Sequence, residues 1–318
     1  MSTIGKFTEN DIQHGALIPM FTDSTLAGGL GWAAGVESDV DKTRWVVRKD
    51  LLAFLKEGNP QNAKAYAEAM KSKKHKTDFA FYEDFCLESL DPLLASEYNS
   101  AYILQKPSIV YAGQNFTLYN PAPLAGDSKL QLAAFERNQH RVIPEVTFLG
   151  KYPLSKATLN RRPDLVMFVN GLYFSYCEVK ATQRKQSSSK DGRAKIARDV
   201  VDATVLALAE GRLRYGQKAG GWPGWGTQLP VAERDLIERA AYPFLRAVHL
   251  STVDMHEFWV LNDLQWLPGE IDTCLRVNNN LSLSVADRDR FIAEVTARFQ
   301  KAPPQPGLQP FENVKRQL

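Results

Sequence analysis

Two apolar segments joined at Asn170-Gly171 constrain the fold of this chain more than any other feature. The segments 162–170 and 172–180 read RPDLVMFVN and LYFSYCEVK, and Asn-Gly between such runs is the strongest short-range signal for a β-hairpin. Both segments are apolar at successive positions, so neither face of either strand is suited to water. We therefore expect a hairpin inside a sheet that is covered on both sides.

Charged residues stand near the open end of this predicted hairpin: Asp164, Glu178 and Lys180. Buried strands avoid ions unless the ions are paired or bind metal, and Glu178 and Lys180 share a face because strands have period two. Two converging carboxylates form an oxygen site suited to Mg²⁺, with Mn²⁺ as a substitute. The alternative is a structural Glu178–Lys180 salt bridge with Asp164 ending a turn. The buried strands and the local basicity favour the metal site.

The length of the hairpin loop decides whether the carboxylates share a face. A two-residue Asn170-Gly171 turn pairs position 164 with 177 and places Asp164 opposite Glu178. A three-residue loop, Val169-Asn170-Gly171, pairs 164 with 176 and brings the two together. We therefore expect a three-residue loop or a bulge in one strand. A structure with Asp164 and Glu178 on opposite faces of the hairpin would contradict the whole predicted metal site.

The charge is distributed unevenly. The chain carries 39 Lys and Arg against 36 Asp and Glu, a net +3. Residues 151–198 hold eleven Lys and Arg against three acids, a net +8, so the remainder carries −5. A basic surface around a few carboxylates suits a polyanion that is held while a bond is cut. The smaller run 71–76 is better explained as a solvated loop.

Several classes of protein and site are not supported. No apolar run approaches the roughly 20 residues of a membrane span, the start lacks a secretory pattern, and the three cysteines form no CxxC motif. A cytoplasmic location is therefore expected. The five histidines show no metal spacing, and no phosphate-binding G-x-x-x-x-G-K-[ST] loop occurs. The three cysteines are Cys86, Cys177 and Cys274.

Apolar periodicity predicts an α/β fold with a mixed central β-sheet flanked by helices and an extra helical N-terminal segment. Residues 1–77 are expected to be a helical extension, 78–300 the main domain, and 301–318 a Pro-rich linker. A helix over 8–22 is capped by Thr8 and limited by Pro19. Further helices are expected over 42–56, 60–71, 78–94, 193–210, 230–240 and 284–300, and strands within 101–149 and 247–263.

The string RRPDLVMFVNGLYFSYCEVK resembles the nuclease motif of the R subunits of type I restriction–modification enzymes, members of the PD-(D/E)xK nuclease superfamily. A Pro-Asp opens a strand in that family, an apolar-VNGL turn follows, and E-x-K closes the next strand. These are Pro163-Asp164, Val169–Leu172 and Glu178–Lys180 here. The resemblance is most specific over about 138–200 and extends over 78–300.

The resemblance implies a PD-(D/E)xK nuclease-like fold, with Asp164 and Glu178 as metal ligands, the Val179 carbonyl as a further ligand, and Lys180 as the catalytic lysine. The superfamily often adds a glutamate from a preceding helix. Glu83 is the first choice for it, Glu88 the second, and Glu9 a distant third. An exposed helix acid explains Glu83 about equally well.

Basic residues beside the motif are the expected DNA contacts. Lys195 and Arg198 are three residues apart on one predicted helix face and suit a phosphate, although a solvated face is the commoner explanation. The family's Gln-x-x-x-Tyr pair is absent from this helix. The full set of expected DNA-binding residues is Arg161, Arg162, Arg184, Lys185, Lys195 and Arg198.

The sequence thus predicts a metal-dependent endodeoxyribonuclease, the Mg²⁺-dependent DNA endonuclease domain of a type I-like R subunit. Its expected partners are DNA and the modification and specificity subunits of a restriction complex, with no membrane. ATP enters only through a motor domain that is not in this chain, which we expect to be the front piece of a longer protein. The alternatives are a stand-alone PD-(D/E)xK nuclease, resolvase-like or from a phage, and an inactive nuclease-like module that binds DNA or docks a partner.

Overall fold

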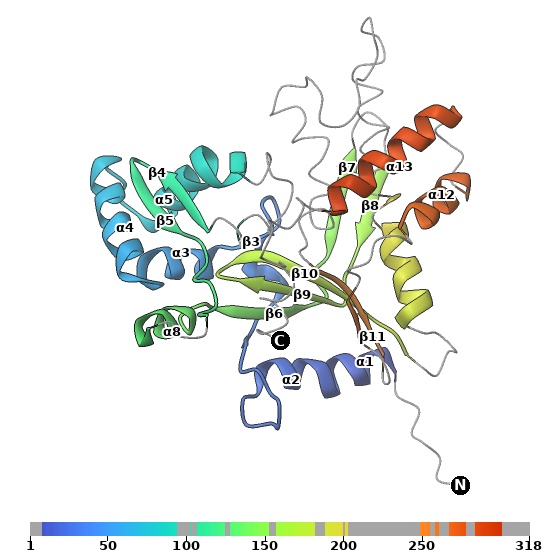
Figure 1. The fold of residues 1–318 in the computed structure, drawn as a ribbon, viewed down its shortest axis with the longest axis horizontal. Coiled ribbons are helices and arrows are strands. Elements are labelled where there is room, and N and C mark those ends of the chain that lie inside the picture. The colour runs from blue at the N-terminus through green and yellow to red at the C-terminus, as the bar shows by residue number, and fades with distance from the viewer. Residues whose placement is uncertain are drawn as a thin grey trace, which may run out of the picture. The chain divides into compact units, whose positions relative to one another are not determined.

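The two apolar segments form adjacent strands, β9 (Leu165–Val169) and β10 (Leu172–Val179). Every residue of both strands is buried, and each strand has a neighbour on both sides, since the sheet runs β1-β6-β9-β10-β11-β12. The predicted hairpin, covered on both faces, is confirmed. Figure 1 shows β9 and β10 as neighbouring strands of the curled sheet.

The computed structural model describes residues 8–93, 103, 107–124, 128–152, 157–181, 188–199, 201–202, 249–254, 258–260, 267–277 and 284–300. These residues form a mixed α/β fold with a curled mixed sheet flanked by helices (Figure 1). The other strands of the sheet are β1 (Ala33–Ala34), β2 (Val40–Asp41), β3 (Val46–Val47), β6 (His140–Pro144), β11 (His249–Val253) and β12 (Phe258–Val260). Separate hairpins are β4 (Ser108–Tyr111) with β5 (Gln114–Thr117), and β7 (Phe148–Tyr152) with β8 (Ala157–Arg161).

The sheet combines both strand directions. β10 pairs in parallel with β11, so that Glu178 lies opposite Thr252, and β1 pairs in parallel with β6. β11 pairs antiparallel with β12, β2 with β3, and β3 with the start of β10. The mixed sheet expected from the sequence is therefore present.

Helical segments precede, separate and follow these strands along the chain. They are α1 (Glu9–Ile12), the π-helical η1 (Gln13–Leu17), α2 (Ile18–Thr22), the 3-10 helix η2 (Glu37–Asp39), α3 (Arg48–Glu57), α4 (Pro60–Ser72), α5 (Asp78–Phe85), the π-helical η3 (Cys86–Leu90), α8 (Lys129–Phe135), the π-helical η5 (Ser188–Gly192), α12 (Leu267–Val277) and α13 (Val285–Gln300). Residues 193–199 are also helical and continue from η5.

The chain divides into two compact units. The described part of the first lies within Met1–Leu17, Pro144–Val166 and Ser175–Lys301, and that of the second within Ile18–Ile143 and Met167–Phe174. Each unit is assembled from separate stretches of chain, with β9 and β10 running from one into the other. The linear division into 1–77, 78–300 and 301–318 remains a prediction, and 301–318 lies outside the described residues.

An aromatic cluster forms the core of the second unit beside the α3, α4 and α5 helices. Phe81, Phe85, Tyr111 and Phe116 are buried, and their ring centroids lie 5.4–6.4 Å apart. Aromatic rings packed at these distances stabilise the fold by more than their buried apolar area alone accounts for.

Most of the predicted elements are present where the structure describes them. The helices α5 and α13 and the strands β4, β6 and β11 lie within the expected ranges, and α4 ends one residue beyond its range. The helix expected over 42–56 begins only at Arg48, because Val46–Val47 form β3, and it ends at Glu57. Prediction missed α8 and α12, and 230–240 lies outside the described part. No helix in that part combines the length and apolar character needed to cross a lipid bilayer.

The first helical segment spans Glu9–Thr22, in agreement with the helix predicted over 8–22. Thr8 caps it through a hydrogen bond from Asp11 N, and the Asp11 side chain returns a bond to the Thr8 backbone. The expected limit at Pro19 is wrong, since helical structure continues to Thr22. The π-helical turn η1 ends two residues before this proline and changes the hydrogen-bond pattern of the preceding turn.

The hairpin loop has two residues, so the predicted three-residue loop is wrong, and the alternative of a bulge in one strand stays a prediction. Asn170 and Gly171 have φ of 50° and 78°, the positive values that a type I′ turn requires at both positions. Asn170 is fully buried. Its side-chain amide donates to Leu118 O at 3.0 Å and Asn138 Oδ1 at 2.9 Å, and its Oδ1 accepts from Gln139 N at 2.7 Å.

We predict that Gly171→Ala destabilises the protein far more than Gly113→Ala. Both glycines have positive φ in hairpin turns, but a Cβ at Gly171 meets Val47 O at 2.4 Å and Leu51 N at 2.5 Å, whereas one at Gly113 meets nothing within 4 Å. We expect a loss of about 3 kcal/mol or more at Gly171, against about 1 kcal/mol at Gly113. Denaturant unfolding measures both, and equal losses would contradict this account of the turn.

Candidate functional site

Asp164 is fixed at the entrance to β9, in the first unit. Its Oδ2 accepts a hydrogen bond from Val179 N at 2.6 Å, which attaches it to the end of β10. Its backbone carbonyl accepts from Glu145 N at 3.0 Å and from Gln13 Nε2 at 2.8 Å. Asp164 lies one residue before the strand, so the alternation of side chains within the strand does not dictate where its carboxylate points.

This position explains how the site survives a two-residue turn. The carboxylate of Asp164 bonds to a backbone N–H at the end of β10, and its pKa responds to the charge of Glu178. Asp164 therefore reaches the end of β10 through this backbone contact and not through the predicted register.

Glu178 has both carboxylate oxygens engaged. Its Oε1 pairs with Lys180 Nζ and its Oε2 with Lys195 Nζ. Tyr176 donates a further bond to Oε2 at 3.2 Å. The Glu178 side chain is only 2% exposed, and its pairing with two ammonium groups and a hydroxyl offsets the cost of burying a carboxylate.

Lys180 is held as a cation. Its Nζ contacts Glu178 Oε1, donates to Val179 O at 2.9 Å and lies 3.6 Å from Glu9 Oε1. Burial acts to lower the pKa of Lys180, but the carboxylates of Glu178, Glu9 and Asp164 outweigh it and raise the pKa above its usual value. Lys180 is therefore protonated at neutral pH and can balance negative charge, but it cannot accept a proton in this arrangement.

A second layer of ionic contacts lies behind Glu178. Tyr176 also donates to Asp199 Oδ2 at 3.1 Å, and Asp199 forms an ion pair with Arg161 Nε at 2.8 Å. Arg161 pairs in turn with Asp202. Burial raises the pKa of Asp199, and the charge of Glu178 adds to this, whereas Lys195 and Arg161 oppose it. The Tyr176 hydroxyl has one proton for two carboxylates, so it couples them.

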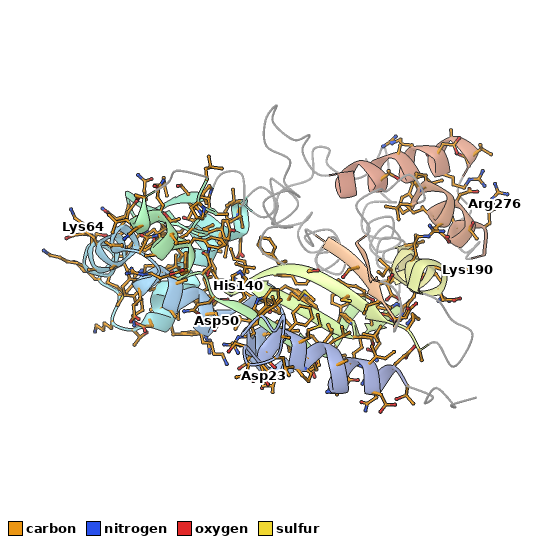
Figure 2. The ribbon with its side chains drawn as sticks, turned by 60° about the horizontal axis from the view of Figure 1, so that its bottom comes forward. Asp23, Asp50, Lys64, His140, Lys190 and Arg276 are labelled. Carbon is orange, nitrogen blue, oxygen red and sulfur yellow. The ribbon has the colours of Figure 1, made fainter. Side chains whose placement is uncertain are left out.

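A close approach of two elements brings Lys195 to Glu178. A Cβ at Gly192 would lie 2.8 Å from the Cβ of Thr252, which is the residue opposite Glu178 on β11. Only glycine lets the end of η5 pack so closely on that strand. Lys195 follows in the next helical turn, which sets its ammonium beside the carboxylate. Figure 2 labels Lys190 at the start of this helical segment.

The other expected DNA contacts have mixed surroundings. Arg162 is exposed and lies 3.5 Å from Glu145. Arg198 is exposed and donates to Ala194 O of its own helix at 3.3 Å. Arg161 pairs with Asp199 and Asp202, so it supports the cluster. Arg184 and Lys185 lie outside the described residues.

The helix glutamate that reaches this cluster is Glu9. Glu83, the first choice, belongs to the second unit and pairs with Arg44 at 3.1 Å. Asp41 and Asp91 also pair with Arg44. Glu88 pairs with Lys73. The structure therefore does not support Glu83 as the completing acid. The sequence signal for Glu9 was only its place in the first turn of a capped helix.

The residues present fit a hard divalent cation. The carboxylates of Asp164 and Glu178 and the Val179 carbonyl are oxygen donors, the class that Mg²⁺ and Mn²⁺ prefer. Within the described ranges, no group of three or more His, Cys, Asp or Glu side chains is arranged to hold a metal. An ion bound here would therefore take few ligands from the protein and keep several waters, as Mg²⁺ commonly does.

The pKa of Asp164 is raised to about 7. Burial is the main cause and the charge of Glu178 the second, whereas Lys195, the Val179 N–H and Lys180 act in the opposite direction. Asp164 therefore shares the near-neutral titration that is common among carboxyls at functional sites.

Comparison with protein-family models, with curated proteins and with solved structures gave no match to this chain.

We predict that Asp164→Asn stabilises the metal-free protein increasingly as the pH rises. The pKa of Asp164 lies higher in the folded protein than in the unfolded chain, so folded wild type binds the proton more tightly and its free energy of unfolding falls between about pH 4 and pH 7. Asparagine does not titrate. The advantage of the variant should grow across this window, up to about 4 kcal/mol, and then stay constant.

Denaturant unfolding in a chelator at several pH values measures this advantage. Asp23→Asn is the control, because hydrogen bonds from exposed Thr25 lower the pKa of Asp23, and its effect should not change between pH 4 and pH 8. A pH-independent effect of Asp164→Asn would contradict the buried, charged environment of Asp164.

Proposed function

We propose that this chain is the Mg²⁺-dependent DNA endonuclease domain of a type I-like restriction R subunit, with a PD-(D/E)xK nuclease fold. The observation that carries the proposal is the single cluster formed by Asp164, Glu178 and Lys180, in which Asp164 bonds to Val179 N and Glu178 pairs with Lys180. These are the residues of the sequence motif, and they supply the oxygen donors and the cation that a metal-dependent nuclease needs.

The chain's own residues would divide the work of phosphodiester hydrolysis. Asp164 and Glu178 would hold the ion with the Val179 carbonyl, and a bound Mg²⁺ would lower the pKa of water and offset phosphate charge. Lys180, held protonated, would balance the charge that develops on the phosphate. Exposed Arg162 and Arg198 would contact the DNA backbone without reading its sequence.

One observation favours a second candidate, a nuclease-like module that binds DNA without cutting it. Both oxygens of Glu178 pair with lysines, an arrangement that satisfies the carboxylate without any ion. Metal binding at Asp164 and Glu178 separates the two candidates. Metal-dependent nicking by the isolated chain without ATP would instead favour a stand-alone nuclease.

We predict that one ion contacts both Asp164 and Glu178 in a crystal soaked with Mn²⁺, and that Asp164→Asn and Glu178→Gln lose it. Lys180→Met should keep the ion, since it removes a cation rather than a ligand. All three variants should lower cleavage by the assembled restriction complex at least about 10²-fold while remaining folded. Full cleavage by all three variants, or an ion bound away from both carboxylates, would refute the proposal.

We predict further that Glu9, and not Glu83, influences the metal site. Glu9→Gln removes a negative charge 3.6 Å from Lys180 and should weaken Mn²⁺ binding several-fold, on the order of fivefold. Glu83→Gln and Glu88→Gln should leave the affinity unchanged, because their carboxylates pair with Arg44 and Lys73. Mn²⁺ titration followed by electron paramagnetic resonance measures all three. A loss confined to Glu83→Gln would restore the sequence-based choice.

A further inference from the structure

The two lysines on Glu178 are held very differently. Lys180 is 7% exposed and contacts Glu178, the Val179 carbonyl and Glu9. Lys195 is 30% exposed and comes from the helical residues 193–199 rather than from β10. Among the described residues, Glu178 is the acid within ion-pair distance of Lys195 Nζ.

This difference decides which lysine can leave. An ion that takes Glu178 as a ligand needs an oxygen that an ammonium now occupies. Moving Lys180 would strand a buried cation away from three partners, which is costly. Lys195 can swing its ammonium into water, where a partly exposed ion pair contributes little to stability. Glu178 Oε2 is therefore the oxygen that can be freed.

A second contact makes the exchange more favourable. When Lys195 leaves Oε2, the Tyr176 hydroxyl, whose one proton is shared between Glu178 and Asp199, still lies 3.2 Å from that oxygen, so the carboxylate keeps a hydrogen-bond partner. Tyr176 is itself fixed by Asp199 at 3.1 Å. The displaced ammonium remains tethered at the edge of the same site, where a bound phosphodiester would offer it a new anion.

We propose that Lys195 is an exchangeable lysine that couples metal binding to DNA binding. Without metal it pairs with Glu178 and masks Oε2; when a divalent cation takes that oxygen, Lys195 pairs with a DNA phosphate beside the ion. This inference rests on the proposed function and adds an order of events to it. The metal binds first and thereby releases Lys195 to bind DNA. Because coupling is reciprocal, DNA should also raise the affinity for metal.

The test compares Lys195→Met with wild type in the full 318-residue chain. Mn²⁺ affinity without DNA is measured by electron paramagnetic resonance, and affinity for a short labelled duplex by fluorescence anisotropy with and without Ca²⁺, an ion that also takes carboxylate oxygens. Lys64→Met is the control, since Lys64 is exposed on α4 and the net charge changes equally (Figure 2). Lys195→Arg tests whether a bulkier cation retains the coupling.

Lys195→Met should bind Mn²⁺ more tightly than wild type, on the order of tenfold, because a competitor for Glu178 is gone. It should also lose most of the gain in DNA affinity that Ca²⁺ gives to wild type. Lys64→Met should match wild type in both measurements, and Lys195→Arg should lie between wild type and Lys195→Met.

A lysine that merely stabilises the fold gives a different result. Unchanged or weaker Mn²⁺ binding in Lys195→Met overturns the exchange, as does a full Ca²⁺-dependent gain in DNA affinity. Failure of the proposed function is distinguishable, because wild type would then show no Mn²⁺ binding that Asp164→Asn removes. That result would overturn both proposals.

Discussion

An ionised carboxylate that is almost fully buried must be neutralised by its surroundings, and Glu178 imposes this requirement on the first unit. Lys180 on the same strand supplies one cation and Lys195 on a neighbouring helical segment supplies the other. That segment reaches Glu178 because Gly192 packs on Thr252 of β11. Asp199 and Arg161 then hold Tyr176 against the carboxylate. Several elements are thus positioned by the need to compensate one charge.

The sequence predicted the hairpin because its signals are local. An Asn-Gly turn between two apolar runs needs no knowledge of the rest of the chain, and the same holds for the helix cap at Thr8. The predicted loop length was wrong because the two-residue period applies only if Asp164 is a strand residue. Asp164 precedes the strand and bonds to a backbone N–H, so the two-residue period did not apply to it. The motif was therefore a better guide to the site than the register was.

Contacts between segments far apart in the chain could not be predicted from the sequence. Glu9 and Gln13 reach Lys180 and Asp164 across more than 150 residues of chain, and no local pattern distinguishes Glu9 from Glu83. Lys195 was expected to face DNA because spacing on a helix indicates which side chains share a face, but not what that face contacts. Tyr176 read as one more apolar strand residue, although its hydroxyl joins two carboxylates.

The two ends of the hairpin are fixed by different interactions: hydrogen bonds and backbone conformation at the turn, and ion pairs at the open end. The site requires both. At the turn, Asn170 satisfies buried amide and carbonyl groups while Gly171 adopts a backbone conformation that a side chain would obstruct. This fixes where β10 begins. Since side chains alternate along a strand, a shift of β10 by one residue would replace Glu178 with Val179 or Cys177 on the face that meets Lys195. Lys195 would then face an apolar side chain, because Lys180 follows β10 directly and would shift with it. The conformation of Asn170-Gly171 therefore determines which residue meets Lys195.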